Sequence, residues 1–181
     1  MTTVDRAHGV WQRWPAALGL VAAVAVLALA PSRETVATSV VAATFCYLAA
    51  AAFDRRRASW AALLATFVLP FPGALLGTPP WLSLAVAALV LVAIGLFGGV
   101  PRAALGAQTA AVVGYGGLAV LGLYLSPGIG LAIAGLTLAA HALWDLVHLR
   151  RDVVVSRSLA EACVWFDVPL GLGVLVLAAL G

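Results

Sequence analysis

Residues 140–171, with the sequence AHALWDLVHLRRDVVVSRSLAEACVWFDVPLG, join two apolar segments through a connection that carries three arginines. Two imidazoles and three carboxylates lie within the apolar segments themselves: His141, Asp145, His148, Glu161 and Asp167. Ionisable groups are costly in hydrocarbon and are rarely placed there by chance. The stretch therefore predicts two helices that share a polar site.

The composition of the whole chain sets the environment of that site. The 181 residues are 64% hydrophobic and only 9% charged, whereas a soluble domain has about a quarter of its residues charged. A soluble fold of this length could not bury so much apolar surface, so the composition predicts an integral membrane protein. We expect the bilayer and a lipophilic small molecule as partners, and no nucleic acid.

Seven apolar runs are candidates for membrane-spanning helices, since a span needs about 20 residues. They cover residues 15–31, 34–53, 58–77, 80–100, 103–126, 128–149 and 158–181. We predict an all-α, polytopic bundle of seven transmembrane helices, with six as the alternative count because the first run is short. Residues 1–14 are predicted to form an amphipathic cytoplasmic segment, and residues 15–181 a single transmembrane domain. Pro70 and Pro72 predict a kink in the third span.

The ten basic residues are all arginines, and their positions predict the orientation. With a cytoplasmic N-terminus and an external C-terminus, nine of the ten lie on the cytoplasmic side and only Arg33 lies outside, in agreement with the positive-inside rule. The arginine- and alanine-rich composition is typical of a GC-rich genome, so we expect a multi-pass protein of a bacterial plasma membrane. Five arginines are also predicted to bind lipid headgroups: Arg55, Arg56, Arg57, Arg150 and Arg151.

The polar groups are predicted to lie at matching depths on the last two helices. His141, Asp145 and His148 have the spacing i, i+4, i+7, which places them on one face of a helix. With a rise of 1.5 Å per residue, His141 is level with Asp167, and Asp145 is level with Glu161 or Cys163. The short connection makes the two helices probable neighbours, so these groups are expected to meet.

Rotation around the last helix separates its two acids. Glu161 and Asp167 are six positions apart, which is about 120° around the helix axis. We therefore predict that Asp167 faces His141 and that Glu161 faces a third partner. Gln108 and the arginines at positions 55–57 are the candidates.

Three interpretations of the cluster stay open. In the preferred one, His141, Asp145 and Asp167, with His148 as fourth ligand or proton shuttle, bind Zn²⁺, Mn²⁺ or Fe²⁺, which suit imidazole and carboxylate ligands. In the second, the cluster is free of metal and handles protons. In the third, it is a network of ion pairs and hydrogen bonds in which Asp145 and Glu161 pair with Arg150, Arg151 or Arg157, and His141 bonds Asp167. Catalytic roles are predicted for Asp145, Asp167 and Glu161.

The position of the polar groups on one side of the membrane favours an enzyme. We predict an integral membrane enzyme that acts on a lipid-like substrate at the inner leaflet, with metal-dependent hydrolysis as the preferred reaction. The alternatives are a lipid-binding sensor or scaffold, a transporter coupled to protons or divalent cations, and a membrane terpene cyclase that uses a buried acid. The pairs Gly73/Gly77 and Gly95/Gly99 are small-residue motifs that would allow close helix packing and a homo-oligomer.

Seven spans with histidine and aspartate near the cytoplasmic side resemble, in architecture, the alkaline ceramidase and adiponectin-receptor superfamily of zinc hydrolases. The site of that superfamily uses three membrane histidines, with a serine and an aspartate on earlier spans. This chain has His141 and His148 on one helix and nothing that matches on the others. Small fungal-type membrane terpene cyclases are also similar in span number and in their use of buried acids. The resemblance assigns no family and no residue roles.

Overall fold

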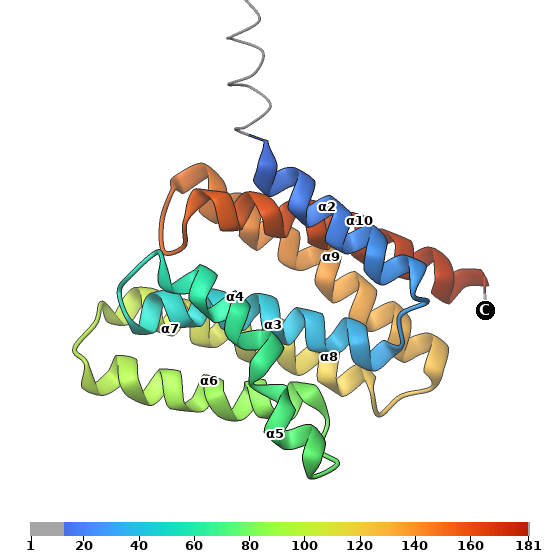
Figure 1. The fold of residues 1–181 in the computed structure, drawn as a ribbon, viewed down its shortest axis with the longest axis horizontal. Coiled ribbons are helices and arrows are strands. Elements are labelled where there is room, and N and C mark those ends of the chain that lie inside the picture. Colours follow the sequence, from blue (N-terminus) through green and yellow to red (C-terminus); the bar gives the residue numbers. More distant parts are fainter. Residues whose placement is uncertain (1–12, 181) are drawn as a thin grey trace, which may run out of the picture.

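The computed structural model describes residues 13–180, and every regular element in this part of the chain is a helix (Figure 1). The elements are α2 (Trp14–Ala28), α3 (Arg33–Ala52), α4 (Ala58–Val68), α5 (Pro70–Leu75), α6 (Pro80–Phe97), α7 (Arg102–Ala111), the π-helix η1 (Val112–Gly116), α8 (Gly117–Gly122), α9 (Pro127–Arg151) and α10 (Arg157–Leu180). The predicted all-α class is therefore confirmed. Residues 1–12 of the predicted amphipathic segment lie outside the described residues.

Six helical segments are long and apolar enough to cross a membrane. They are α3, the pair α4 and α5, α6, the run from α7 to α8, α9 and α10. Helix α2 is apolar but has only 15 residues, which is about 22 Å at 1.5 Å per residue. The chain is thus built as a multi-pass membrane protein, with six full-length spans and one shorter helix in the described part.

Two of the six segments are interrupted. The predicted kink in the third span is present, since α4 ends at Val68 and α5 begins at Pro70. The ring of a proline clashes with the preceding turn and its nitrogen carries no hydrogen, so a continuous helix is disfavoured there. The segment from α7 to α8 contains the π-helix η1, whose sequence is VVGYG. Short π-helical insertions often occur at functional sites.

Helix α3 lies at the centre of the bundle and contacts α4, α6, α7, α8 and α9. The side-chain oxygen of Ser32 accepts a hydrogen bond from the Thr35 amide and so caps the start of the helix. The second half of α3, with the sequence TFCYLAAAA, is buried throughout. Alanine side chains are small, so five neighbours can approach the same helix closely.

Helix α10 packs along both α9 and α2 (Figure 1). Glycines make these approaches close: a Cβ atom on Gly171 would lie only 2.7 Å from the backbone nitrogen of Ala139 on α9. A Cβ atom on Gly19 of α2 would overlap the carbonyl oxygen of Ala162 on α10. The two contacts fix the lateral position of α10, which carries Asp167.

Neither of the two predicted small-residue pairs has both of its glycines on a packed helix face. Gly77 and Gly99 each have φ of 70° and follow the end of a helix, a conformation that glycine adopts without the strain other residues would meet. A Cβ atom on either residue would meet nothing within 4 Å. Gly95 alone of these four contacts a neighbouring transmembrane segment's backbone, at Ala52. Gly77 and Gly99 are therefore turn residues. The prediction of two helix-packing pairs from the four-residue spacing is wrong because α5 and α6 end before these glycines.

The α3–α4, α6–α7 and α9–α10 connections lie at the same end of the bundle (Figure 1). These connections and the adjoining helix turns carry seven arginines: Arg55, Arg56, Arg57, Arg102, Arg150, Arg151 and Arg157. Arg56 Nη1 donates to Asp152 Oδ2 at 2.9 Å, and Arg56 Nη2 donates to the Asp152 carbonyl. This pair joins the α3–α4 turn to the α9–α10 loop, and both side chains are about half exposed.

Candidate functional site

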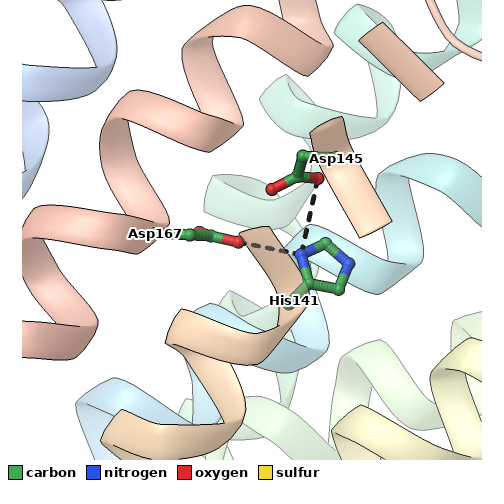
Figure 2. A group of neighbouring side chains, drawn as sticks. All are labelled: His141, Asp145 and Asp167. Atoms are coloured by element: carbon green, nitrogen blue, oxygen red, sulfur yellow. Dashed lines mark hydrogen bonds and ion pairs between the residues drawn. The ribbon is translucent and has the colours of Figure 1, made fainter. Parts of the chain in front are cut away.

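Three ionisable side chains meet between α9 and α10, and Figure 2 shows the two carboxylates directed toward one imidazole. His141 Nδ1 lies 2.8 Å from Asp167 Oδ2 and 3.5 Å from Asp145 Oδ1. All three side chains have an exposed fraction of 0%. The predicted meeting of His141 with Asp167 is present in the structure.

Helix geometry explains why these residues meet. His141 lies ten positions before the end of α9 at Arg151, and Asp167 lies ten positions after the start of α10 at Arg157. Ten residues correspond to about 15 Å of helix, so both side chains reach the same depth. Asp145 follows His141 by four positions and therefore points to the same side of α9.

The three groups offer more hydrogen-bond acceptors than the protein around them can satisfy. Both oxygens of Asp145, Asp167 Oδ1 and His141 Nε2 are buried and have no hydrogen-bond partner in the described part of the protein. An unsatisfied polar group in an apolar interior costs several kcal/mol (about 1–3 in mutational data). The site therefore calls for a cation or for additional protons.

The donor set fits a divalent metal. One ligand atom from each of His141, Asp145 and Asp167 can be chosen so that all three lie within 4.8 Å of one another. His141 Nδ1 is 2.8 Å from an oxygen of Asp167 and 3.5 Å from an oxygen of Asp145. Two ligand atoms of a tetrahedral metal with bonds of about 2.0 Å are ~3.3 Å apart, which lies between these two distances. One imidazole nitrogen with two carboxylate oxygens suits Zn²⁺, Mn²⁺ or Fe²⁺.

Two tyrosines that the sequence did not point to complete the surroundings of His141. The rings of Tyr47 on α3 and Tyr115 on η1 lie edge-on to the imidazole, at centroid distances of 5.7 and 5.2 Å. Tyr115 belongs to the π-helix, so the irregular turn of the fifth span lies directly against the site. The Tyr47 hydroxyl is buried and has no hydrogen-bond partner in the described residues.

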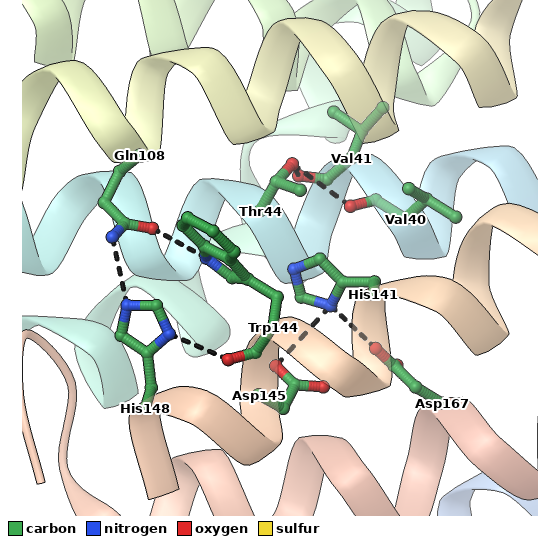
Figure 3. A network of polar contacts seen from close by, with 9 residues as sticks. All are labelled: Val40, Val41, Thr44, Gln108, His141, Trp144, Asp145, His148 and Asp167. Carbon is green, nitrogen blue, oxygen red and sulfur yellow. Dashed lines mark hydrogen bonds and ion pairs between the residues drawn. The ribbon is translucent and has the colours of Figure 1, made fainter. Parts of the chain in front are cut away.

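His148 belongs to a second polar network, which includes Gln108 and Trp144 (Figure 3). Trp144 Nε1 donates to Gln108 Oε1 at 3.0 Å, and this bond fixes the orientation of the amide. Gln108 Nε2 must then donate to His148 Nε2 at 3.1 Å, so His148 carries its proton on Nδ1 and donates it to the Trp144 carbonyl at 2.8 Å. The imidazole is thus a neutral tautomer with both nitrogens engaged.

These contacts place several predicted residues apart from the metal-binding group. His148 is not one of the three clustered ligands, and its role as fourth ligand or shuttle stays a prediction. Gln108 contacts His148 and Trp144 rather than Glu161. Glu161 is half-buried on α10 and makes no hydrogen bond or ion pair within residues 13–180, and its catalytic role also stays a prediction.

Ion pairs with arginine do not neutralise the acids of the two helices. Within residues 13–180, Asp145 and Asp167 have ion-pair partners only in His141, and Arg56 pairs with Asp152 on the loop. The network interpretation is therefore wrong in pairing Asp145 with an arginine, whereas the bond that it predicted between His141 and Asp167 is present at 2.8 Å. The sequence suggested the arginine pairing because arginines flank both helices, but all of them lie at the helix ends.

A large apolar cavity reaches the site from the side. It has a volume of about 840 Å³ and is bounded by α2, α3, α4 and α10, with contributions from the start of α6. Asp167 lines it together with Cys46 and Cys163. A second hollow, of about 650 Å³, lies at the arginine-bearing end and is lined by Phe53, Arg55, Arg56, Arg57, Ala58 and Ala61.

No known protein family, curated protein or solved structure matches the chain. The chemistry of the site is therefore argued from its own residues. A buried group of one imidazole and two carboxylates can hold a divalent cation or can share protons, and the cavity beside Asp167 can admit an apolar molecule.

Proposed function

We propose that the chain is an integral membrane enzyme that holds a divalent metal with His141, Asp145 and Asp167 and acts on a lipid-like substrate. The observation that carries the proposal is the convergence of three ligand atoms in a wholly buried site whose remaining oxygens have no partner. Zn²⁺, Mn²⁺ and Fe²⁺ are the metals that fit this donor set.

Charge balance supports a cation at this position. Two ionised carboxylates and a neutral imidazole carry two negative charges, and one divalent ion cancels them. Without it, protons would have to balance the charge, because hydrocarbon strongly disfavours net charge about 15 Å from the helix ends. A divalent cation acts as a Lewis acid on a carbonyl or phosphoryl group and favours the ionisation of water. Hydrolysis of an ester, amide or phosphate bond is therefore the proposed reaction class, with Asp167, the ligand that lines the cavity, nearest the substrate.

The proposed topology has seven spans with a cytoplasmic N-terminus, and α2 is the first span. The arginine-bearing connections lie together at one end of the bundle, which is the arrangement that the positive-inside rule favours for the cytoplasmic side. Trp14 and Trp60 stack near the same end, with centroids 5.4 Å apart, as is common at a membrane interface. We propose a bacterial plasma membrane as the location.

Arginines at this end are proposed to hold lipid headgroups. Arg55 and Arg57 line the hollow of about 650 Å³ beside the α3–α4 turn and make no ion pair within residues 13–180. Guanidinium groups near the cytoplasmic leaflet attract anionic phosphates. Arg56 is engaged with Asp152 and is a weaker candidate.

Metal analysis of the purified protein tests the proposal. We expect about one equivalent of a transition metal per chain after loading and desalting, and loss of that metal in Asp145→Asn and Asp167→Asn, because three ligands define the site. Asp54→Asn is the matched control, since Asp54 is an exposed carboxylate on the α3–α4 turn. Equal metal binding by all four proteins, or none by the wild type, would refute the metal site.

A metal-free acid is the second candidate. His141 Nδ1 is within ion-pair distance of both carboxylates, so a protonated imidazole, one ionised acid and one protonated acid also make a neutral group. The protonated acid could then donate a proton to a polyene or epoxide in the cavity, as in acid-type cyclisation. Activity that depends on Asp167 in a protein free of metal would favour this candidate.

A further inference from the structure

The cavity beside Asp167 opens sideways, toward lipid. Three of its lining residues also lie on the outer surface: Leu18 of α2 is 46% exposed, and Leu64 and Phe67 of α4 are 69% and 70% exposed. Asp167, at the inner wall, is fully buried and has an unpartnered Oδ1 atom. A molecule dissolved in the bilayer could therefore pass between α2 and α4 to the inner wall without crossing water, and a side-chain movement there would bring it into contact with the Asp167 carboxylate.

The charges of the lining restrict what can occupy the cavity. Among the described residues, its ionisable lining groups are two acids, Glu34 and Asp167, and two cysteines, and no arginine or histidine of residues 13–180 lines it. With a divalent metal bound, the site has no net charge, so a phosphate or a fatty-acid carboxylate would bring a negative charge that no further cation of the lining compensates, in a region where desolvation is costly. The occupant is therefore an uncharged lipid.

The depth of Asp167 restricts where the reacting bond lies. The carboxylate is about 15 Å from the start of α10, which is half of the ~30 Å hydrocarbon thickness of a bilayer. The ester bonds of a phospholipid lie beside its headgroup, at the membrane surface. A bond that meets Asp167 must instead have hydrocarbon on both sides.

The length of the cavity agrees with such a molecule. Its lining runs along α3 from Ser32 to Cys46, which is 14 positions or about 21 Å, and so extends beyond one leaflet. Glu34, Thr38 and Ser39 line the end near Ser32 and provide polar groups along which water can reach the cavity. We infer that the cavity binds a linear, uncharged long-chain ester that lies along the helices with its ester group beside Asp167.

This inference rests on the proposed hydrolase function and names its substrate class. In the reaction, water adds across the bond between the acyl carbon and the ester oxygen. That bond breaks, and the products are a carboxylic acid and an alcohol. The acid product carries a charge that the lining does not favour, so it would leave the cavity.

Retention of decyl decanoate by the protein in phosphatidylcholine nanodiscs tests the inference, with bound ester measured by mass spectrometry after repurification. We expect the active wild type to cleave decyl decanoate, so its retention is measured with the uncleavable analogue didecyl ether. The wild type should retain the ether and should retain decanoic acid at least about tenfold less. Ala42→Phe places a ring in the cavity and should lower ether retention about tenfold or more. Ala110→Phe is the matched control, because Ala110 is exposed on α7 and does not line the cavity. Ala22→Phe, on the opposite wall, replaces Ala42→Phe if the latter fails to fold.

Asp145→Asn separates this inference from the metal proposal, since Asp145 is a metal ligand that does not line the cavity. It should retain the ester and lose its cleavage. Equal retention of ether and decanoic acid, or equal retention by Ala42→Phe, Ala22→Phe and Ala110→Phe, would overturn the inference while leaving the metal site in place. Ester retention by a wild type that holds no metal would refute the proposed function and support the binding site.

Discussion

The imidazole of His141 is the element on which the buried site depends, and its removal should cost more stability than removal of Asp167. His141→Leu leaves Asp145 and Asp167 without any partner at zero exposure. Removing one partner of a buried ion pair costs about 3–5 kcal/mol. Asp167→Leu leaves His141 with Asp145, only 3.5 Å away, so the expected loss is that of one unpartnered polar group, about 1–3 kcal/mol.

Thermal unfolding in detergent, monitored by circular dichroism, measures these losses of stability. A chelator is present so that bound metal does not contribute to them. For a chain of this size, 1 kcal/mol corresponds to about 2–4 °C in Tm. We therefore expect Tm to fall by about 6–20 °C for His141→Leu and by about 2–12 °C for Asp167→Leu. The double variant should lose less than the sum, by about 0.5–3 kcal/mol, because residues in contact are coupled.

The opposite pattern would refute this reasoning. Equal losses that add in the double variant would mean that His141 and Asp167 do not share a proton or an ion, and the site would have to be rebuilt around Asp145. Adding Zn²⁺ or Mn²⁺ after removal of the chelator gives an independent check. A metal bound only by the folded state raises Tm, so the wild type should gain stability and the two single variants should gain much less.

Three further predictions concern the surroundings of the site. Gly19→Ala should lower Tm, because the added Cβ would overlap the Ala162 carbonyl and push α2 away from α10, at a cost of about 1–3 kcal/mol in stability. Gly106→Ala is the control, since its Cβ would meet nothing within 4 Å and the change should be neutral or stabilising. Gln108→Leu should lower the free energy of unfolding by about 1–3 kcal/mol, because the indole of Trp144 and the imidazole of His148 lose their partner. The metal affinity of this variant should be unchanged. A tenfold fall in metal affinity would instead place His148 among the ligands. Replacing Arg55 and Arg57 together by glutamine should reduce the amount of co-purified anionic lipid, and an unchanged amount would exclude the hollow as a headgroup site.

The part of the site that could be predicted from the sequence is the part fixed by helix rise. Composition was sufficient for a membrane bundle, and a short connection made α9 and α10 neighbours. The depth of His141 and Asp167 then followed from 1.5 Å per residue, and their contact is present at 2.8 Å. The 120° between Asp167 and Glu161 showed that both could not face α9, but the angle alone did not determine which of the two does.

The remaining contacts depend on how other helices are rotated and translated, which periodicity in one helix does not fix. Gln108 lies on the fifth span, and its amide could equally have met Glu161 until the packing of α7 was known. Tyr115 reaches His141 from a π-helix. Glycines in VVGYG lower the preference for a regular α-helix, but they do not indicate where the extra residue is inserted.

The two polar networks of α9 show why the metal site is favoured over accidental polarity. Around His148, each buried donor has one acceptor: indole to amide oxygen, amide nitrogen to imidazole, and imidazole to carbonyl. Seven residues earlier, around His141, two carboxylates surround a single imidazole, and both oxygens of Asp145 and one of Asp167 have no partner within residues 13–180. The same helix in the same apolar environment thus satisfies one set of polar groups completely and leaves the other with an excess of acceptors. Since unsatisfied buried groups destabilise a fold, an excess of acceptors beside a satisfied network sets this group apart as one that could hold a cation or additional protons.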